Sequence, residues 1–306
     1  MVSDRLVSGG MSDPLANKNL IYHAGDAIVV IGYAGKAYGL HPSKRDMPTD
    51  EWIAETLWGK PIPRGRDGRT PATINFGEAG KVLSIDQAIR LLQTELEKSF
   101  QRLPASVRKR STVHLAIAGW KENRRGIVQF VLAQILKRGG SFIVESPPRY
   151  IYRARHKSCV VSFPDGYILA AELSHLAKRL CALTPDASES LFVDEIRRIA
   201  LLRPDKVGPH CLSILLPPHD IKPIRVRFIP TVEHKALISF PSKGISKTLT
   251  VAFSPWILGP RMLSAPALMN GNSTVHMGPI TIDLEAPPPQ QGISVMSSLK
   301  RPPSGS

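Results

Sequence analysis

Residues 19–35, NLIYHAGDAIVVIGYAG, contain two apolar runs separated by Gly25 and Asp26. Glycine and aspartate are common in tight turns, so this stretch predicts a β-hairpin. The second run, residues 27–33, is apolar at nearly every position instead of at alternate ones. This pattern is typical of a strand that is covered on both faces. We therefore expect the strand to lie inside a layered structure.

Helix signals follow this hairpin along the chain. Ser84 and Gln87 form a capping-box pattern ahead of an apolar stripe, which predicts a helix over residues 84–103. Thr49 is expected to cap a shorter helix whose first turn carries acidic residues. The other predicted helices cover residues 168–182 and 189–203.

Predicted strands fill much of the remaining chain. Residues 126–136 fit a buried helix by their periodicity and a strand by their content of valine, isoleucine and phenylalanine. The short polar link at residues 121–125 favours a hairpin, so we predict a strand there. Further strands are expected over residues 111–120, 141–145, 157–163, 210–216, 224–229 and 235–240, with strand-like segments at 248–253 and 278–284.

Strands and helices thus come in separate groups, in the order ββ, αα, a run of β, αα and β. Because each sheet needs cover on both faces, this order predicts an α+β fold, a four-layer α/β/β/α sandwich. We assign residues 1–246 to this domain and residues 247–284 to a C-terminal β extension. Residues 285–306 bury too little apolar surface to fold, and we expect them to form a disordered tail.

Composition excludes several classes of protein. With 306 residues and 42% hydrophobic content, the chain can bury a sizeable core. Its three cysteines lie far apart without a CxxC pair, and its histidines show no HxxxH spacing, so we expect no disulfide framework, no metal site and no cofactor. No leader begins the chain and no apolar run reaches about 18 residues. We expect a cytoplasmic protein without a membrane segment.

The chain is strongly basic, with 40 lysines and arginines against 25 acidic residues and a formal net charge of +15. The basic residues form small knots, such as those at residues 64–69 and 108–110, without a long tract or interleaved aromatic residues. This distribution favours a solvated basic surface and disfavours nucleic-acid binding. An acidic partner that binds the arginine-rich loop at residues 64–69 and the basic tail is an alternative.

Several stretches, in their order along the chain, resemble the proteasome-type N-terminal nucleophile (Ntn) hydrolases, and in particular bacterial proteasome-like proteins. The resemblance covers residues 1–217. It is carried by SDRLVSGG, NKNLIYHAGDAIVVIGYAG, the helix start TDEW, VHLAIAGW and VDEIRRIALLRPDKVGPHCLSILLPP.

The resemblance implies a peptide or amide hydrolase, and self-association through helix layers leads us to expect a homo-oligomer. In this family the nucleophile is the first residue of the mature chain, and its freed α-amino group accepts the proton. By position, Asp4 matches the orienting aspartate, Lys18 the lysine that lowers the pKa of the nucleophile, and Gly35 the oxyanion glycine. Without the resemblance, these three would be a turn residue, a surface lysine and a strand-end glycine.

The family places a full strand and a turn ahead of the segment that matches Asp4, but here only Met1, Val2 and Ser3 precede it. Cleavage that exposes Ser3 is disfavoured, since Ser3 lies in the wrong strand. We therefore expect the 306-residue chain to lack the nucleophile and to be inactive, whether the reading frame begins upstream or the residue has been lost. A non-catalytic, self-assembling or binding protein is the alternative.

Overall fold

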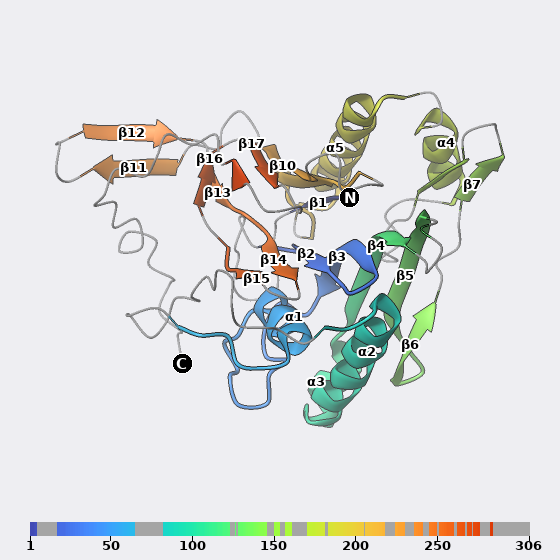
Figure 1. Ribbon diagram of the computed structural model, residues 1–306, viewed down its shortest axis with the longest axis vertical. Helices are drawn as coiled ribbons and strands as arrows, with labels where there is room; N and C mark the ends of the chain where they lie inside the picture. Colours follow the sequence, from blue (N-terminus) through green and yellow to red (C-terminus); the bar gives the residue numbers. More distant parts are fainter. Residues whose placement is uncertain are drawn as a thin grey trace.

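The computed structural model of the chain describes the following residues: 1–4, 17–64, 82–122, 126, 128–145, 150–153, 157–160, 170–180, 183–204, 206–217, 224–229, 236–240, 245–249, 251–259, 262–266, 268–270, 272–275 and 282–283. These residues form a mixed α+β structure with two larger sheets (Figure 1). The predicted tail, residues 285–306, lies outside them.

The helices are α1 (Thr49–Trp58), α2 (Ile85–Gln101), α3 (Ala105–Arg110), α4 (Ala170–Leu180) and α5 (Pro185–Leu202). The strands of the two larger sheets are β1 (Val2–Asp4), β2 (Asn19–His23), β3 (Ala27–Gly35), β4 (Val113–Glu122), β5 (Val128–Arg138), β6 (Ser141–Glu145), β9 (Cys211–Leu215), β10 (Ile224–Ile229), β14 (Trp256–Gly259), β15 (Met262–Ser264), β17 (Asn272–Val275) and β18 (Ile282–Asp283). Three smaller pairs comprise β7 (Tyr150–Arg153) with β8 (Lys157–Val160), β11 (Ala236–Phe240) with β12 (Ile245–Leu249), and β13 (Val251–Phe253) with β16 (Leu268–Asn270).

The larger sheet has seven strands in the order β15-β14-β2-β3-β4-β5-β6. All neighbours are antiparallel except β14 and β2, which run parallel with Ile257 opposite Ile21. Helix α1 contacts β14 and β2, and α2 contacts β6, so both helices lie against one face of this sheet. The sheet thus joins the predicted 19–35 hairpin to a strand from the C-terminal part of the chain.

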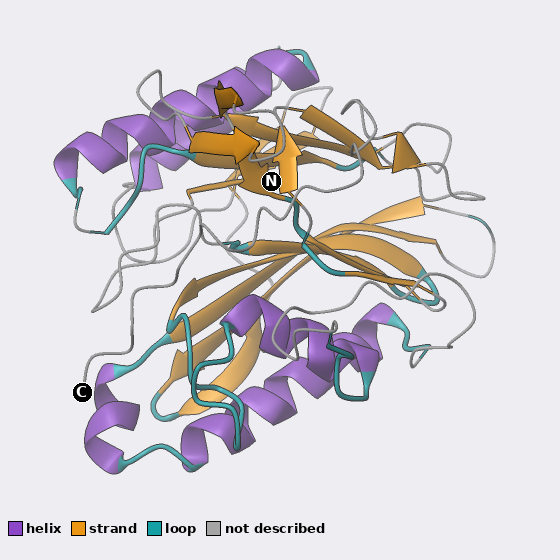
Figure 2. Cartoon of the chain, turned by 90° about the vertical axis from the view of Figure 1, so that its left-hand side faces the viewer, coloured by secondary structure: helices purple, strands orange, loops and turns teal. Residues whose placement is uncertain are grey.

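The second sheet has five strands in the order β1-β9-β10-β17-β18. Helix α5 contacts β1 and β9 from this sheet. Figure 2 shows the two sheets stacked, with helices on their outer sides. Strand β17 pairs with β10, so residues beyond 247 contribute to both sheets.

Two apolar clusters cover the two faces of the predicted hairpin. Val29 and Ile31 pack with Trp52 and other side chains of the helix side. Ile21 and Val30 face the other way and pack with residues of the five-stranded sheet, including Leu212, Ile214, Val226 and Phe228. The prediction that residues 27–33 are covered on both faces is therefore confirmed, because successive side chains in a strand point to opposite faces.

The secondary-structure predictions have mixed outcomes. The capping box at Ser84 and Gln87 is present at the start of α2, and the strand predicted over residues 126–136 is found as β5, two residues further along the chain. The prediction that Thr49 caps α1 is wrong. Pro48 is the N-cap, and Thr49 Oγ1 donates instead to the Lys36 carbonyl at 2.7 Å.

The two helices expected near residues 168–182 and 189–203 correspond to α4 and α5. In the part of the chain that the structure describes, no helix is both long and apolar enough to cross a membrane.

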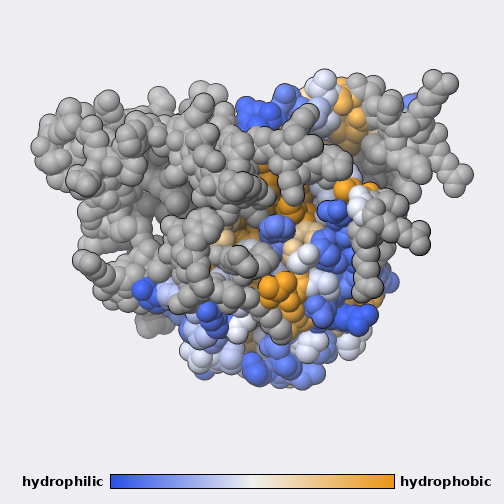
Figure 3. Space-filling model, in the orientation of Figure 1, coloured by the Kyte–Doolittle hydropathy of each residue, from blue (hydrophilic) through white to orange (hydrophobic). Residues whose placement is uncertain are grey.

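In the face shown in Figure 3, the lower end, where α2 and α3 lie, is mostly hydrophilic.

Candidate functional site

Gly35 ends β3 in a conformation that requires glycine. Its φ is +96°, and a Cβ atom there would lie 2.2 Å from the Thr112 carbonyl oxygen. The segment that follows is fixed on both sides, since Lys36 N donates to Thr112 O at 2.7 Å and Thr49 N donates to Ala37 O at 2.8 Å. The backbone at Gly35 is therefore rigid.

The direction of the Gly35 N–H follows from its neighbours. Tyr33 N donates to the Lys18 carbonyl at 2.9 Å on the β2 side, whereas Lys36 N donates to Thr112 on the β4 side. The N–H groups of successive residues in a strand point alternately to its two sides. We therefore assign the Gly35 N–H to the β2 side, near the start of that strand, where Lys18 lies.

Strand β1 of the other sheet approaches the same point. Asn19 is buried, and its Nδ2 donates to Ser3 Oγ at 2.5 Å. Gly32 lies opposite Asn19 in the sheet, and a Cβ atom there would lie 2.9 Å from both Asn19 Oδ1 and Met1 Sδ. The absence of a side chain at Gly32 therefore leaves room for the side chains of Met1 and Asn19.

Two orphan acceptors flank Lys18. Asn17 and Asn19 are both buried, and the Oδ1 atom of each has no hydrogen-bond partner among the described residues. Asn17 uses its Nδ2 to donate to the Ser254 carbonyl at 2.6 Å. Buried polar atoms are normally satisfied, so two unsatisfied acceptors on either side of Lys18 are unusual.

The N-terminal residue continues the β1 ladder. Met1 N donates to Ile214 O at 2.7 Å, and Ile214 N donates back to Met1 O at 2.8 Å. This exchange is the hydrogen-bonded pair of an antiparallel ladder. Burial lowers the pKa of the Met1 α-amino group to about 6, and the charge of Glu189 partly offsets this shift.

The three residues singled out by the resemblance thus lie on segments that meet. Asp4 is in β1 opposite Cys211, one residue from Ser3, which contacts Asn19 next to Lys18. Lys18 in turn bonds through its backbone to Tyr33, two residues before Gly35. The structure describes the backbone of Asp4 and not its side chain, so the catalytic roles of these residues stay predictions.

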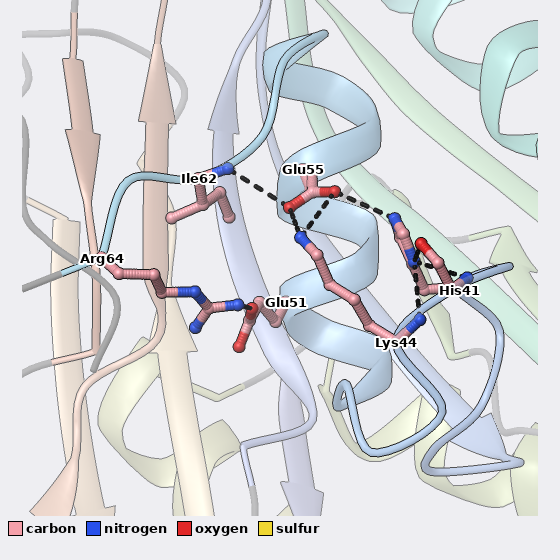
Figure 4. A network of polar contacts seen from close by, with 7 residues as sticks. His41, Lys44, Glu51, Glu55, Ile62 and Arg64 are labelled. Atoms are coloured by element: carbon pink, nitrogen blue, oxygen red, sulfur yellow. Dashed lines mark hydrogen bonds and ion pairs between the residues drawn. The ribbon is translucent and has the colours of Figure 1, made fainter. Parts of the chain in front are cut away.

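A second polar cluster holds the loop after Gly35 against α1 (Figure 4). Its hub is Glu55, whose carboxylate accepts from Lys44 Nζ at 3.0 Å and from Ile62 N at 3.2 Å and lies 3.2 Å from His41 Nε2. Lys44 N donates to His41 Nδ1 at 3.1 Å. Since Nδ1 accepts this bond, Nε2 carries the proton that His41 donates to Glu55.

Glu51, one turn before this hub, forms an ion pair with Arg64. Arg64 was expected on an exposed arginine-rich loop, but its side chain is half-buried by this contact. The rest of that loop, residues 65–69, lies outside the described residues. Arg64 therefore helps to hold the segment after α1.

Sequence reasoning missed a buried carboxyl group at the start of α1. Trp256 Nε1 donates to Asp50 Oδ2 at 3.1 Å, and both side chains are buried. Burial raises the pKa of Asp50 to about 7, against the opposing effect of hydrogen bonds from the Glu51 backbone and Trp256. The only sequence signal was an acidic first turn, because the tryptophan comes from a strand more than 200 residues away.

The site thus combines a lysine, a glycine whose N–H we assign to the β2 side of β3, and buried amide oxygens. Such a group can hold and stabilise an oxyanion or a polar backbone segment. In the part of the chain that the structure describes, no group of three or more histidine, cysteine or acidic side chains could hold a metal ion. No protein-family model, curated protein or solved structure matches the chain.

Proposed function

We propose that this chain is the scaffold of a proteasome-like Ntn hydrolase, a four-layer α/β/β/α sandwich that cleaves peptide or amide bonds once a terminal nucleophile is in place. One observation carries the proposal. Asn19, next to Lys18, contacts Ser3 of strand β1, and the Lys18 carbonyl accepts from Tyr33, two residues before Gly35. These contacts support the proposal, because the resemblance implies that the three segments lie near one another.

In the proposed reaction, the nucleophile's hydroxyl or thiol gives its proton to the free α-amino group of the same residue and attacks the substrate carbonyl. The Lys18 ammonium favours the deprotonated nucleophile by its charge. The Gly35 N–H donates to the carbonyl oxygen as it becomes an oxyanion, and its rigid backbone keeps that donor in place. Asp4 orients Lys18. The acyl intermediate is then released by water.

The outer edge of β1 is where we propose that the nucleophile strand pairs. Among the described residues, β9 is the one strand paired with β1, so β1 is an edge strand of the described part of the sheet, and its other edge is the one to which we assign the nucleophile strand. The unsatisfied Oδ1 atoms of Asn17 and Asn19 lie next to Lys18 and are available to donors brought by that strand or by a substrate.

The test compares two forms of the protein. The gene is read upstream in frame to the first threonine, serine or cysteine that can head a strand, and both the extended and the 306-residue chains are purified. We expect hydrolysis of fluorogenic peptide or amide substrates by the extended chain alone. Lys18→Ala should abolish this activity, and Lys98→Ala, at an exposed lysine on α2, should leave it unchanged.

Two results contradict the proposal. One is hydrolysis by the 306-residue chain that Asp4→Ala abolishes, because the nucleophile would then lie within residues 1–306. The other is an extended chain whose native N-terminus, read by Edman or mass-spectrometric sequencing, is correctly processed but which hydrolyses none of these substrates.

A further inference from the structure

Basic side chains gather on helix α3 and just after α2: Arg102, Lys109 and Arg110 are exposed, and Arg108 is partly buried. Arg102 follows α2 directly, and Arg108, Lys109 and Arg110 form the last turn of α3. We call these four residues the α3 basic patch. Residues 98–121 contain no aspartate or glutamate, so the patch has no acidic neighbour along the chain.

Stabilisation of the C-terminus of α3 does not explain why these basic residues are there. Cations near a helix C-terminus often stabilise its free carbonyl groups. Here that role falls to Lys137 of β5, whose Nζ donates to the carbonyl oxygens of Arg108 and Ser111. The side chains of Lys109 and Arg110 are exposed instead.

The neighbouring acids are already engaged. Glu97 accepts from Phe142 N at 2.8 Å, Glu95 pairs with Lys98 at 2.8 Å, and Glu145 pairs with Arg138. No ion pair within the described residues involves any member of the α3 basic patch. Four like charges therefore lie close together without an ion-pair partner among the described residues, and their mutual repulsion raises the free energy of the folded protein.

We infer that the α3 basic patch is a docking surface for an acidic, partly apolar peptide segment of another protein. The helix is six residues long, about 9 Å at 1.5 Å per residue. An extended peptide covers this length with about three residues. Val107, 38% exposed on the same helix, offers an apolar contact between the charges, so alternating acidic and apolar side chains suit the surface.

Two features favour a peptide over a nucleic acid. The patch contains no aromatic side chain on which a base could stack, and stacking is a main source of affinity for single strands. It is also short, whereas duplex binding needs basic contacts along several phosphates of a strand. The lower end of the surface in Figure 3, where α3 lies, is hydrophilic and convex, which suits a segment laid across it.

The experiment measures fluorescence anisotropy of a labelled peptide of alternating glutamate and valine, with the full 306-residue chain, at about 0.1 M salt. The variant Arg108→Gln/Lys109→Gln/Arg110→Gln removes three charges from the patch. The matched control, Arg45→Gln/Arg90→Gln/Arg179→Gln, removes three charges from exposed sites on other elements. Circular dichroism checks that both variants fold. The catalytic proposal is independent of this surface.

We expect binding that weakens about tenfold or more in the patch variant and about twofold or less in the control. Equal weakening in both variants would show a response to net charge alone and overturn the inference. Absence of binding to the native chain would do the same. A single-stranded oligonucleotide of equal charge, or a phosphatidylserine vesicle, that binds more tightly than the peptide through the same three residues would also overturn it.

Discussion

Adding two residues ahead of Met1 converts its buried α-ammonium group into an amide, which is neutral and still donates to Ile214 O. In the chain that begins at Met1, burial lowers the pKa of this amine from 8.0 to about 6. The folded state therefore loses the proton at lower pH than the unfolded state does. Between pH 6 and 8 the unfolded state holds more protons, so stability rises with pH over this window.

The pKa of this amine differs by two units between the unfolded and folded states, which corresponds to about 2 to 3 kcal/mol of unfolding free energy, at about 1.4 kcal/mol per unit. The original chain is the less stable of the two below about pH 6, and this deficit disappears above about pH 8. Asp50 makes stability fall as the pH rises, and it does so equally in both chains. Its pKa is raised to about 7, so its contribution is full below about pH 4 and is lost as the pH rises to about 7. It cancels from the comparison.

The assay is urea unfolding of the two chains from about pH 5.5 to 8.5, after mass spectrometry has shown that Met1 is retained. We expect the difference in unfolding free energy between the chains to shrink by about 2 to 3 kcal/mol from the acid to the alkaline end. New contacts made by the added residues give a constant offset. A difference that does not change with pH would refute the burial of this amine in the β1 ladder.

Three further substitutions, one of them with a matched control, test other parts of the structure. Asp50→Asn keeps an acceptor for the tryptophan indole and removes the buried acid, so it should raise stability at pH 8 relative to pH 5 by about 2 to 4 kcal/mol in urea unfolding. Gly35→Ala should cost about 3 kcal/mol or more, from its positive φ and its contact with a carbonyl, and an unchanged melting temperature would contradict this. Glu97→Leu leaves the Phe142 N–H without its acceptor and should cost about 1 to 3 kcal/mol, whereas Glu95→Leu on the exposed face should cost less than about 1 kcal/mol.

Local sequence patterns predicted helices and strands well where residues close together in the sequence determine the structure. The doubly apolar run at residues 27–33 indicated a strand covered on both faces, and the Ser84 and Gln87 pattern located the start of α2. The short link at residues 121–125 correctly favoured a strand over a helix for β5. These features depend on periodicity and turn chemistry, which are properties of contiguous sequence.

Long-range pairing could not be predicted. Nothing near Trp256 indicates that its strand runs parallel to β2 or that its indole meets Asp50. Arg64 was predicted on an exposed loop because its neighbours are glycines, prolines and arginines, but its partner Glu51 lies on the preceding helix. The orphan oxygen of Asn19 likewise depends on β1 packing across from β2. Only the resemblance pointed to this corner of the fold.

The most direct test of the proposed catalytic scaffold is covalent labelling of the upstream-extended chain with a peptide β-lactone, an acylating reagent. Peptide mapping by mass spectrometry then locates the adduct. We predict one acyl group on the first residue of the mature chain, absent from the Lys18→Ala variant. A chain that is processed but unlabelled, or labelled on an internal residue regardless of Lys18, would contradict the proposal.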